Sequence, residues 1–149
     1  MSQFSFSNSG IEALFLSAEK LLFNKSNLIP IKYDNFDVST FDKLNKSLLQ
    51  TISKKPIVYC IWVKANSNEY KAMYIGHAKE TISRQRIRCH LTKKNKRTGA
   101  KLDNVKECLS RKETIALSYL IIEPSYMRKP LEEWLIIKNK EQLVWNRNI

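Results

Sequence analysis

Two segments near the start of the chain repeat apolar residues at the spacing of an amphipathic helix. The first covers residues 11 to about 24, where Ser9 and Glu12 form the Ser-x-x-Glu pattern of a helix start. The second runs from residue 39 or 40 to residue 53. The two apolar faces consist of Ile11, Leu14, Phe15, Ala18, Leu21 and Leu22, and of Phe41, Leu44, Leu48 and Ile52. Residues 26–38, with a proline and several Asn and Asp residues, predict an irregular connection.

The pattern changes after Pro56 to runs of β-branched and aromatic residues. Residues 57–63 are apolar on both faces, which predicts a central strand. Residues 70–75 predict a second strand, which pairs with the first as an antiparallel hairpin. Residues 114–122 predict a third strand by their β propensity.

Three further helices are predicted around these strands. A basic helix covers residues 80–94, a short helix covers residues 103–110, and a last helix begins at Pro130, a favoured first-turn position for proline. The fold class is therefore α/β in the α+β sense, with a small three-stranded antiparallel sheet flanked by helices. We expect this domain in residues 56–149, preceded by a helical N-terminal extension in residues 1–55.

Composition indicates a folded protein of 149 residues, because 43% of them are hydrophobic. No apolar run reaches the roughly 20 residues of a membrane span. The first ten residues contain no Lys or Arg, which argues against a secretory signal. Cys60, Cys89 and Cys108 are odd in number, far apart and without a paired spacing, which argues against both a disulfide framework and a zinc site. Together these features favour a reducing, cytoplasmic location.

The formal net charge of +12 is concentrated in the second part of the chain. Residues 1–55 hold seven basic and five acidic residues, whereas residues 56–149 hold 19 and nine. One stretch of 18 positions contains no acid and eight basic residues, namely Arg84, Arg86, Arg88, Lys93, Lys94, Lys96, Arg97 and Lys101. Such a field predicts a polyanionic partner, since neutralised phosphates release counterions. The stretch lacks the apolar face of a membrane-surface helix, so nucleic acid is favoured and a membrane is not expected.

Five short motifs stand in order on the predicted elements between residues 56 and 148. They are Ile57-Val58-Tyr59 on the first strand, Tyr74-Ile75-Gly76 on the second, Arg86 with His90 four positions later, Glu132 in a Glu-x-x-Leu-Ile pattern, and Asn146. In this order the chain resembles the GIY-YIG nuclease family. It departs from the family at Ile57, where the first triplet of the family has glycine. Each motif alone is common, but five in order are fairly specific.

The resemblance implies metal-dependent hydrolysis of phosphodiester bonds. A carboxylate such as Glu132 can hold one hard cation, Mg²⁺ or Mn²⁺, which binds phosphate oxygens. The neighbouring Glu133 is the alternative ligand. Arg86 offers a planar fork of donors to the scissile phosphate.

The resemblance also implies a general base, Tyr59. A tyrosine has an unperturbed pKa of about 10, so nearby cations would have to lower it, and Lys71 and Arg86 are the candidates. His90 would relay the proton or contact phosphate, and Tyr74 would orient the water or the phosphate. Two residues have supporting roles in the family, Gly76 through close backbone approach and Asn146 through structural support.

The expected activity is that of a DNA endonuclease, with RNA left open. A chain of this size resembles the restriction or phage-related branch of the family, in which cleavage is site-specific, and a homodimer would let single-site subunits cut both strands. Two alternatives remain: a catalytically inactive nucleic-acid-binding module of the same fold, and an interaction protein whose basic helix docks an acidic partner. Taken singly, Tyr59 also fits a core tyrosine, His90 a surface residue, and Glu132 or Glu133 a first-turn acid.

Overall fold

A computed structural model describes residues 2–6, 10–34, 37–66, 68–92 and 101–146. Its centre is an antiparallel sheet of four strands in the order β1-β4-β2-β3. The strands are β1 (Ile29–Pro30), β2 (Ile57–Lys64), β3 (Tyr70–Ala78) and β4 (Thr114–Ile121). The α+β class and the three predicted strands are confirmed. The sheet has one strand more than predicted, because residues 29 and 30 pair with Leu117 and Ala116 at its edge, where a proline interrupts no ladder.

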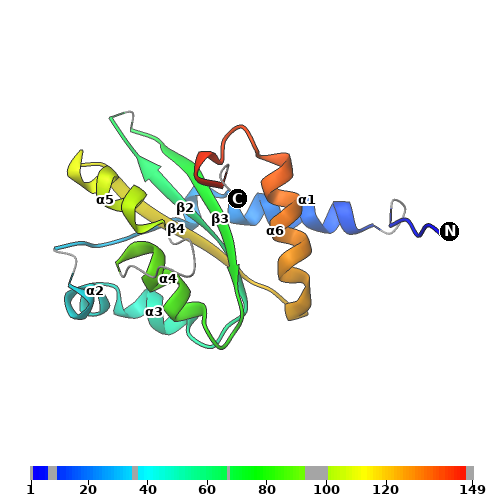
Figure 1. The fold of residues 1–149 in the computed structure, drawn as a ribbon, viewed down its shortest axis with the longest axis horizontal. Coiled ribbons are helices and arrows are strands. Elements are labelled where there is room, and N and C mark those ends of the chain that lie inside the picture. Colours follow the sequence, from blue (N-terminus) through cyan, green and yellow to red (C-terminus); the bar gives the residue numbers. More distant parts are fainter. Residues whose placement is uncertain (1, 7–9, 35–36, 67, 93–100, 147–149) are drawn as a thin grey trace.

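Helices cover both faces of the sheet (Figure 1). One layer contains α1 (Ile11–Leu22) and α6 (Arg128–Lys138), which cross each other on one side. The other layer contains α2 (Val38–Leu44), α3 (Lys46–Ile52), α4 (Ser83–Leu91) and α5 (Leu102–Ser110). Three single 3₁₀ turns complete the described chain, η1 (Lys25–Asn27), η2 (Ser125–Met127) and η3 (Val144–Asn146). None of the helices in these ranges is long and apolar enough to cross a membrane.

The predicted second helix is two helices, α2 and α3, which meet at Asn45. The buried Asn45 amide donates to the carbonyl oxygens of Lys32 (2.9 Å) and Phe41 (3.0 Å), and its Oδ1 accepts from the Lys32 backbone N–H (3.0 Å). These bonds attach the segment after β1 to the helix junction. The prediction of one continuous helix was wrong. The apolar spacing continues through the break, and the hydrogen bonds of Asn45 to a distant part of the backbone cannot be recognised from that spacing.

Several element boundaries also differ from the prediction. The basic helix α4 begins at Ser83 instead of residue 80 and ends at Leu91, and residues 93–100 lie outside the described part of the chain. Strand β3 continues to Ala78, so Gly76 lies inside the strand and not at its end. Helix α1 starts after Gly10, and the predicted cap Ser9 lies outside the described residues.

The sheet separates two apolar cores. Tyr59 and Tyr74 belong to the core beneath α2 to α5, whereas Trp62 belongs to the core beneath α1 and α6. Residues of the N-terminal part belong to both cores. Leu22 lies in the core beneath α1 and α6. A larger group lies in the core beneath α2 to α5, namely Ile31, Phe41, Leu48, Leu49 and Ile52. The segment that the sequence predicts as a helical extension therefore packs directly on the sheet that carries the motifs.

Candidate functional site

The first two motifs meet face to face on neighbouring strands. Tyr59 on β2 is paired with Gly76 on β3, and its ring is fully buried. A Cβ atom at Gly76 would lie 2.5 Å from the Tyr59 hydroxyl oxygen and 2.6 Å from Cζ. Both distances are far below van der Waals contact. The glycine of the Tyr-Ile-Gly triplet is therefore needed because the Tyr59 side chain occupies the space above it.

Tyr59, Tyr74 and His90 form a cluster of three rings between the sheet and α4. The ring centroids are 6.3 Å apart for the two tyrosines, 5.7 Å for Tyr59 and His90, and 5.0 Å for Tyr74 and His90. Lys101 approaches from the start of α5, with its Nζ 5.5 Å from the centre of the Tyr74 ring. The structure thus places Lys101, which the sequence suggested only as a phosphate contact, beside the three rings.

His90 is a buried, neutral histidine with a defined tautomer. Its Nδ1 accepts a hydrogen bond from the Lys101 backbone N–H (3.1 Å), so the ring hydrogen of the neutral form is on Nε2. Burial, together with the positive charges of Arg86 and Lys101, lowers the pKa of His90 to about 3. The interpretation of His90 as a surface residue was wrong, since its side chain is completely inaccessible.

Two buried polar atoms in this cluster lack a well-formed hydrogen bond among the described residues. They are the His90 Nε2 and the Tyr59 hydroxyl, of which the latter interacts with the side chain of Arg86. A buried polar atom without a partner costs roughly 1–3 kcal/mol, and such atoms in native proteins commonly meet a water, ion or ligand. Both atoms lie in the interior of the protein, within reach of the charge of Arg86.

Arg86, on α4, is the positive centre of the site. It is half-buried, and its charge acts on both tyrosines, on His77, on His90 and on Glu132. It favours the ionised form of the tyrosines and the glutamate and the neutral form of the histidines. One guanidinium within reach of so many titratable groups is the arrangement expected where a protein binds an anion.

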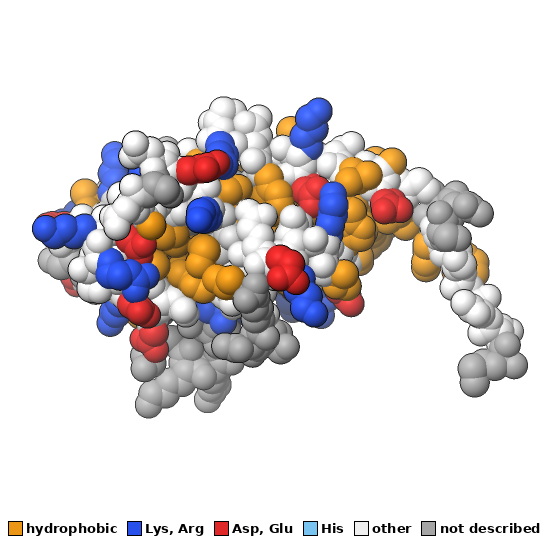
Figure 2. Space-filling view, turned by 90° about the horizontal axis from the view of Figure 1, so that it is seen from above, with side chains coloured by type: hydrophobic (Ala, Val, Ile, Leu, Met, Phe, Trp, Pro, Cys, Tyr) orange, Lys and Arg blue, Asp and Glu red, His pale blue; other side chains and the backbone are white. Residues whose placement is uncertain are grey.

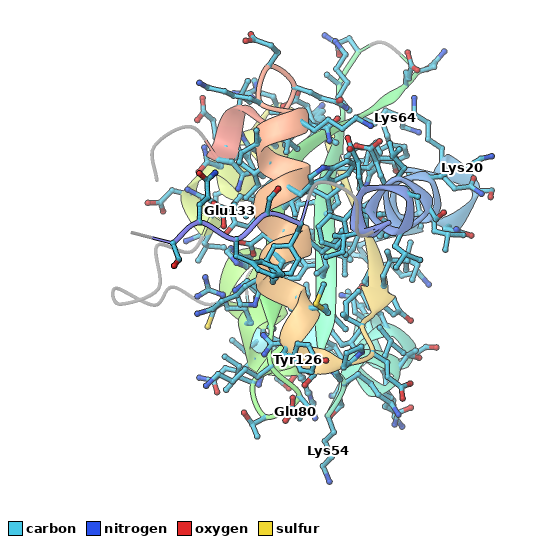
Figure 3. The ribbon with its side chains drawn as sticks, turned by 90° about the vertical axis from the view of Figure 1, so that its right-hand side faces the viewer. Lys20, Lys54, Lys64, Glu80, Tyr126 and Glu133 are labelled. Carbon is cyan, nitrogen blue, oxygen red and sulfur yellow. The ribbon has the colours of Figure 1, made fainter. Side chains whose placement is uncertain are left out.

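Glu132 faces this site from α6. Burial raises the pKa of its carboxyl to about 7, although Arg86, Lys129 and Arg128 act in the opposite direction. A cavity of about 350 Å³ lies in front of it, lined by His77, Lys129, Glu132, Glu133, Ile136 and Ile137. Glu133 is exposed on the outer surface of α6 (Figure 3). Of the two acids, Glu132 is thus the one near the tyrosines, whose pKa values its charge raises.

His77 and Arg128 belong to the site but were missed in the sequence. The guanidinium Nη1 of Arg128 lies 2.9 Å from His77 Nδ1, and His77 Nε2 lies 3.8 Å from Oε2 of Glu132. Burial and the charges of Arg128, Lys129 and Arg86 lower the pKa of His77 to about 4. Only its place directly after Gly76 could have drawn attention to His77, and nothing in the local sequence marks Arg128.

The predicted lowering of the Tyr59 pKa was wrong. Burial raises this pKa well above the ordinary value, Tyr74 raises it further, and the opposing effect of Arg86 is smaller. Lys71 takes no part in it: the side chain is exposed and lines a different cavity with Phe23 and Trp62. The strand pairing is irregular between Ile61 and Trp62, which the sequence does not show.

Asn146 connects the end of the described chain to the Tyr-Ile-Gly strand. Its Nδ2 donates to the Ile75 carbonyl oxygen (3.0 Å) and its Oδ1 accepts from the Ile75 N–H (2.9 Å). The side chain is buried and occupies both backbone groups of the residue between Tyr74 and Gly76. Asn146 thereby supplies hydrogen-bond partners to the free edge of β3 at the Tyr-Ile-Gly triplet.

Replacing Asn146 with Ala should destabilise the fold by about 2 kcal/mol or more, because two buried backbone groups of Ile75 lose their partner. Urea unfolding followed by circular dichroism measures the change. Asn27→Ala is the matched control, since Asn27 is exposed and donates one long bond of 3.4 Å to Leu21. Equal effects of the two substitutions would contradict the proposed support of β3.

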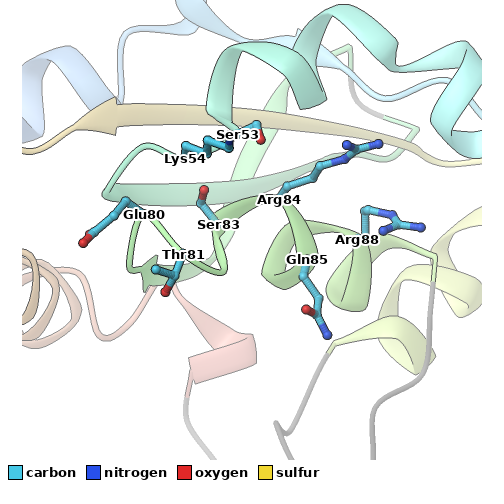
Figure 4. A pocket seen from close by; sticks show the side chains of 8 residues that line it. All are labelled: Ser53, Lys54, Glu80, Thr81, Ser83, Arg84, Gln85 and Arg88. Atoms are coloured by element: carbon cyan, nitrogen blue, oxygen red, sulfur yellow. The ribbon is translucent and has the colours of Figure 1, made fainter.

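The outer side of α4 is less positive than its sequence suggests. Arg84 and Arg88 both approach Asp42 of α2, at 3.9 Å and 3.1 Å. Beside them is an open cavity of about 320 Å³, to which the turn before β2 contributes Lys54. Arg84 and Arg88 project from α4 in one direction and Gln85 points away from them (Figure 4). The remaining predicted phosphate contacts lie outside the described residues: Lys93, Lys94, Lys96 and Arg97.

Charges of both signs are mixed over another face of the protein. Figure 2 shows Lys and Arg side chains interspersed with Asp and Glu, and apolar side chains exposed toward the end that carries the N-terminus. Large apolar residues exposed in the N-terminal part of the chain are Phe4, Phe6 and Leu14. This face offers no uniform positive field.

Comparison of the chain with models of known protein families, with curated proteins and with solved structures finds no match. Within the described ranges, no group of three or more His, Cys, Asp or Glu side chains is gathered for a metal ion. A cation at Glu132 would therefore have at most two such side chains as ligands among these residues. This fits Mg²⁺, which keeps several waters and commonly uses one or two carboxylates together with phosphate oxygens.

Proposed function

We propose that the protein is a metal-dependent nuclease that hydrolyses phosphodiester bonds of DNA. The observation that carries the proposal is the convergence of Arg86, Glu132 and the three rings of the cluster, because the charge of Arg86 acts on the two tyrosines, on His90 and on Glu132. These side chains come from β2, β3, α4 and α6. A merely structural core gains nothing from burying a carboxyl, a histidine and a tyrosine hydroxyl together with a guanidinium.

Each described residue has a role that its position allows. Arg86, which is half-buried, binds non-bridging oxygens of the scissile phosphate. His90 is completely inaccessible and supports the ring of Tyr74 from inside the protein. Glu132 would hold Mg²⁺ or Mn²⁺. When bound, this cation supplies positive charge to the phosphate during attack by water. Lys101 adds positive charge beside Tyr74.

The two tyrosines act through their neutral hydroxyl groups. Burial raises the pKa of both, so each keeps its hydrogen near neutral pH. A neutral hydroxyl can donate one hydrogen bond and accept another, which suits it to orient the attacking water against the phosphate. This role replaces the general base that the resemblance implies for Tyr59.

The proposal is tested by incubating the purified protein with supercoiled plasmid and Mg²⁺, with EDTA and the Arg86→Ala variant in parallel. Mg²⁺-dependent cleavage that Arg86→Ala loses is the expected result. Discrete fragments would identify a site-specific enzyme and a smear a non-specific one. A labelled RNA of the same sequence tests the choice of substrate. No cleavage of either nucleic acid, by a protein that binds both, would reject hydrolysis.

The second candidate is a catalytically inactive nucleic-acid-binding module. It is favoured by Ile57, which replaces the family's first glycine, and by the exposed cationic cavity of Lys54 and Arg84. Both candidates require contacts to backbone phosphates. They differ in whether Mg²⁺ leads to product.

Removing two of these cations should reduce the salt dependence of DNA binding. With Lys54→Gln and Arg84→Gln combined, we expect the slope of log K against log salt to fall by up to about 2, since each phosphate contact contributes about 0.9. Fluorescence anisotropy at several salt concentrations measures it. The matched control is Lys20→Gln with Lys140→Gln, which removes two exposed lysines outside the site and should leave the slope unchanged. An unchanged slope in the first variant would place the phosphate contacts elsewhere.

A further inference from the structure

We propose that Arg128 and His77 form a positioning pair for Glu132: Arg128 fixes the tautomer of His77, and His77 holds one carboxylate oxygen so that the other faces the cation. The inference rests on the proposed function, because it concerns how Glu132 holds a divalent cation. It assigns a role to two residues outside the five motifs.

The first step is the contact between Arg128 and His77. Arginine has only donors, so His77 Nδ1, 2.9 Å from Arg128 Nη1, is the acceptor. The hydrogen of the neutral imidazole is therefore on Nε2. A protonated Nε2 cannot bind a metal ion, and an Nδ1 engaged by arginine cannot either. The contact thus excludes His77 as a ligand and makes it a donor.

The second step is the approach of His77 to Glu132. Its Nε2 lies 3.8 Å from Glu132 Oε2, a distance that a small rotation of the carboxylate closes to a hydrogen bond. Glu132 follows Arg128 by four residues, so both project from the same face of α6 toward β3. With Oε2 facing His77, Oε1 is left for the cation. Partners of this kind orient metal-binding carboxylates in proteins generally.

The surroundings keep His77 in this state. Arg128 and Lys129 on α6 and Arg86 on α4 all place positive charge near the ring, and Glu132 is its acidic neighbour. The side chain is about one-fifth exposed, so most of the ring is held between these groups. His77 is thus a positioning residue that acts on the site through Glu132.

The test measures Mn²⁺ affinity of the full-length protein without nucleic acid, by the electron paramagnetic resonance signal of free Mn²⁺. His77→Leu should weaken Mn²⁺ binding about 10- to 100-fold. His77→Gln should stay within about threefold of the wild type, because its amide retains an acceptor for Arg128 and a donor for Glu132. Thermal unfolding in EDTA confirms that both variants fold.

A charge-matched pair separates the hydrogen bond from electrostatics. Arg128→Gln and Lys129→Gln each remove one positive charge near Glu132, but only Arg128 contacts His77. We expect Lys129→Gln to bind Mn²⁺ at least as tightly as the wild type and Arg128→Gln to bind it less tightly. Equal effects of the two would overturn the positioning role of Arg128.

Three other results would overturn the inference. The first is an unchanged Mn²⁺ affinity in His77→Leu. The second is an equal loss of Mn²⁺ affinity in His77→Gln and His77→Leu, which would make His77 itself a ligand. The third is that the wild-type protein binds no Mn²⁺. Failure of the proposed function gives a different result. A wild-type protein that binds Mn²⁺ but cleaves no nucleic acid rejects hydrolysis, while the differences in Mn²⁺ affinity between the variants still support the positioning pair.

Discussion

Glu132→Gln is expected to lower the rate of phosphodiester cleavage about 1,000-fold or more. The substitution removes the carboxylate that holds the cation, and a metal ion contributes several kcal/mol of charge stabilisation to such a reaction. About 4 kcal/mol corresponds to three powers of ten in rate. Initial rates on plasmid DNA at saturating Mg²⁺ measure the loss.

Glu133→Gln is the matched control. The two acids are neighbours on α6, but Glu133 is exposed and Glu132 is half-buried. Surface substitutions change free energies by about 0.5 kcal/mol, so Glu133→Gln should alter the rate about twofold at most. A large loss in Glu133→Gln with an active Glu132→Gln would exchange the roles of the two acids.

Stability should change in the opposite direction to activity. Burial raises the pKa of Glu132 to about 7 from 4.5, so the folded protein binds more protons than the unfolded chain between these values. The protonated carboxyl therefore stabilises the fold below pH 4.5, and this contribution is lost as pH rises through 7. In EDTA at pH 8, Glu132→Gln should be more stable than the wild type by on the order of 1 kcal/mol, and the difference should shrink toward pH 5. A variant that is inactive because it is unfolded would show the reverse.

Periodicity and composition predicted the elements that carry the site. The alternation from helical spacing to β-branched runs located β2 and β4, and the motif order placed Tyr59, Arg86 and Glu132 on a strand and two helices. The local sequence predicts the type of each element because apolar residues that face the core recur about every 3.6 residues in a helix and every second residue in a strand. The strand β1 was missed because two residues that pair at a sheet edge have no measurable period.

The chemistry of the site was less predictable than its elements. The pKa of the Tyr59 hydroxyl depends mainly on its burial, and this burial arises only when the sheet and α4 pack together. The inclusion of His77 depends on Arg128, 51 residues away in the chain. Charge counted along the sequence likewise missed Asp42, which approaches Arg84 and Arg88 across an interface between helices.

Gly76→Ala is expected to destabilise the protein by about 1–3 kcal/mol, as overpacking of a filled core does. The added methyl group would overlap the end of the Tyr59 ring, at 2.5 Å from its oxygen and 2.6 Å from Cζ. Both residues are buried in paired strands, so neither backbone can move away freely. Chemical denaturation measures the change in the free energy of unfolding.

A double-mutant cycle identifies the Tyr59 ring as the cause. In a Tyr59→Leu background the end of the ring is absent, so Gly76→Ala should cost at least about 1 kcal/mol less than in the wild type. In a Tyr59→Phe background Cζ remains, and the cost should persist. Cleavage should be impaired in Tyr59→Phe and in the relieved double variant alike, because both lack the hydroxyl that orients water. An equal cost of Gly76→Ala in all three backgrounds would mean that the glycine serves β3 itself and not the space above it.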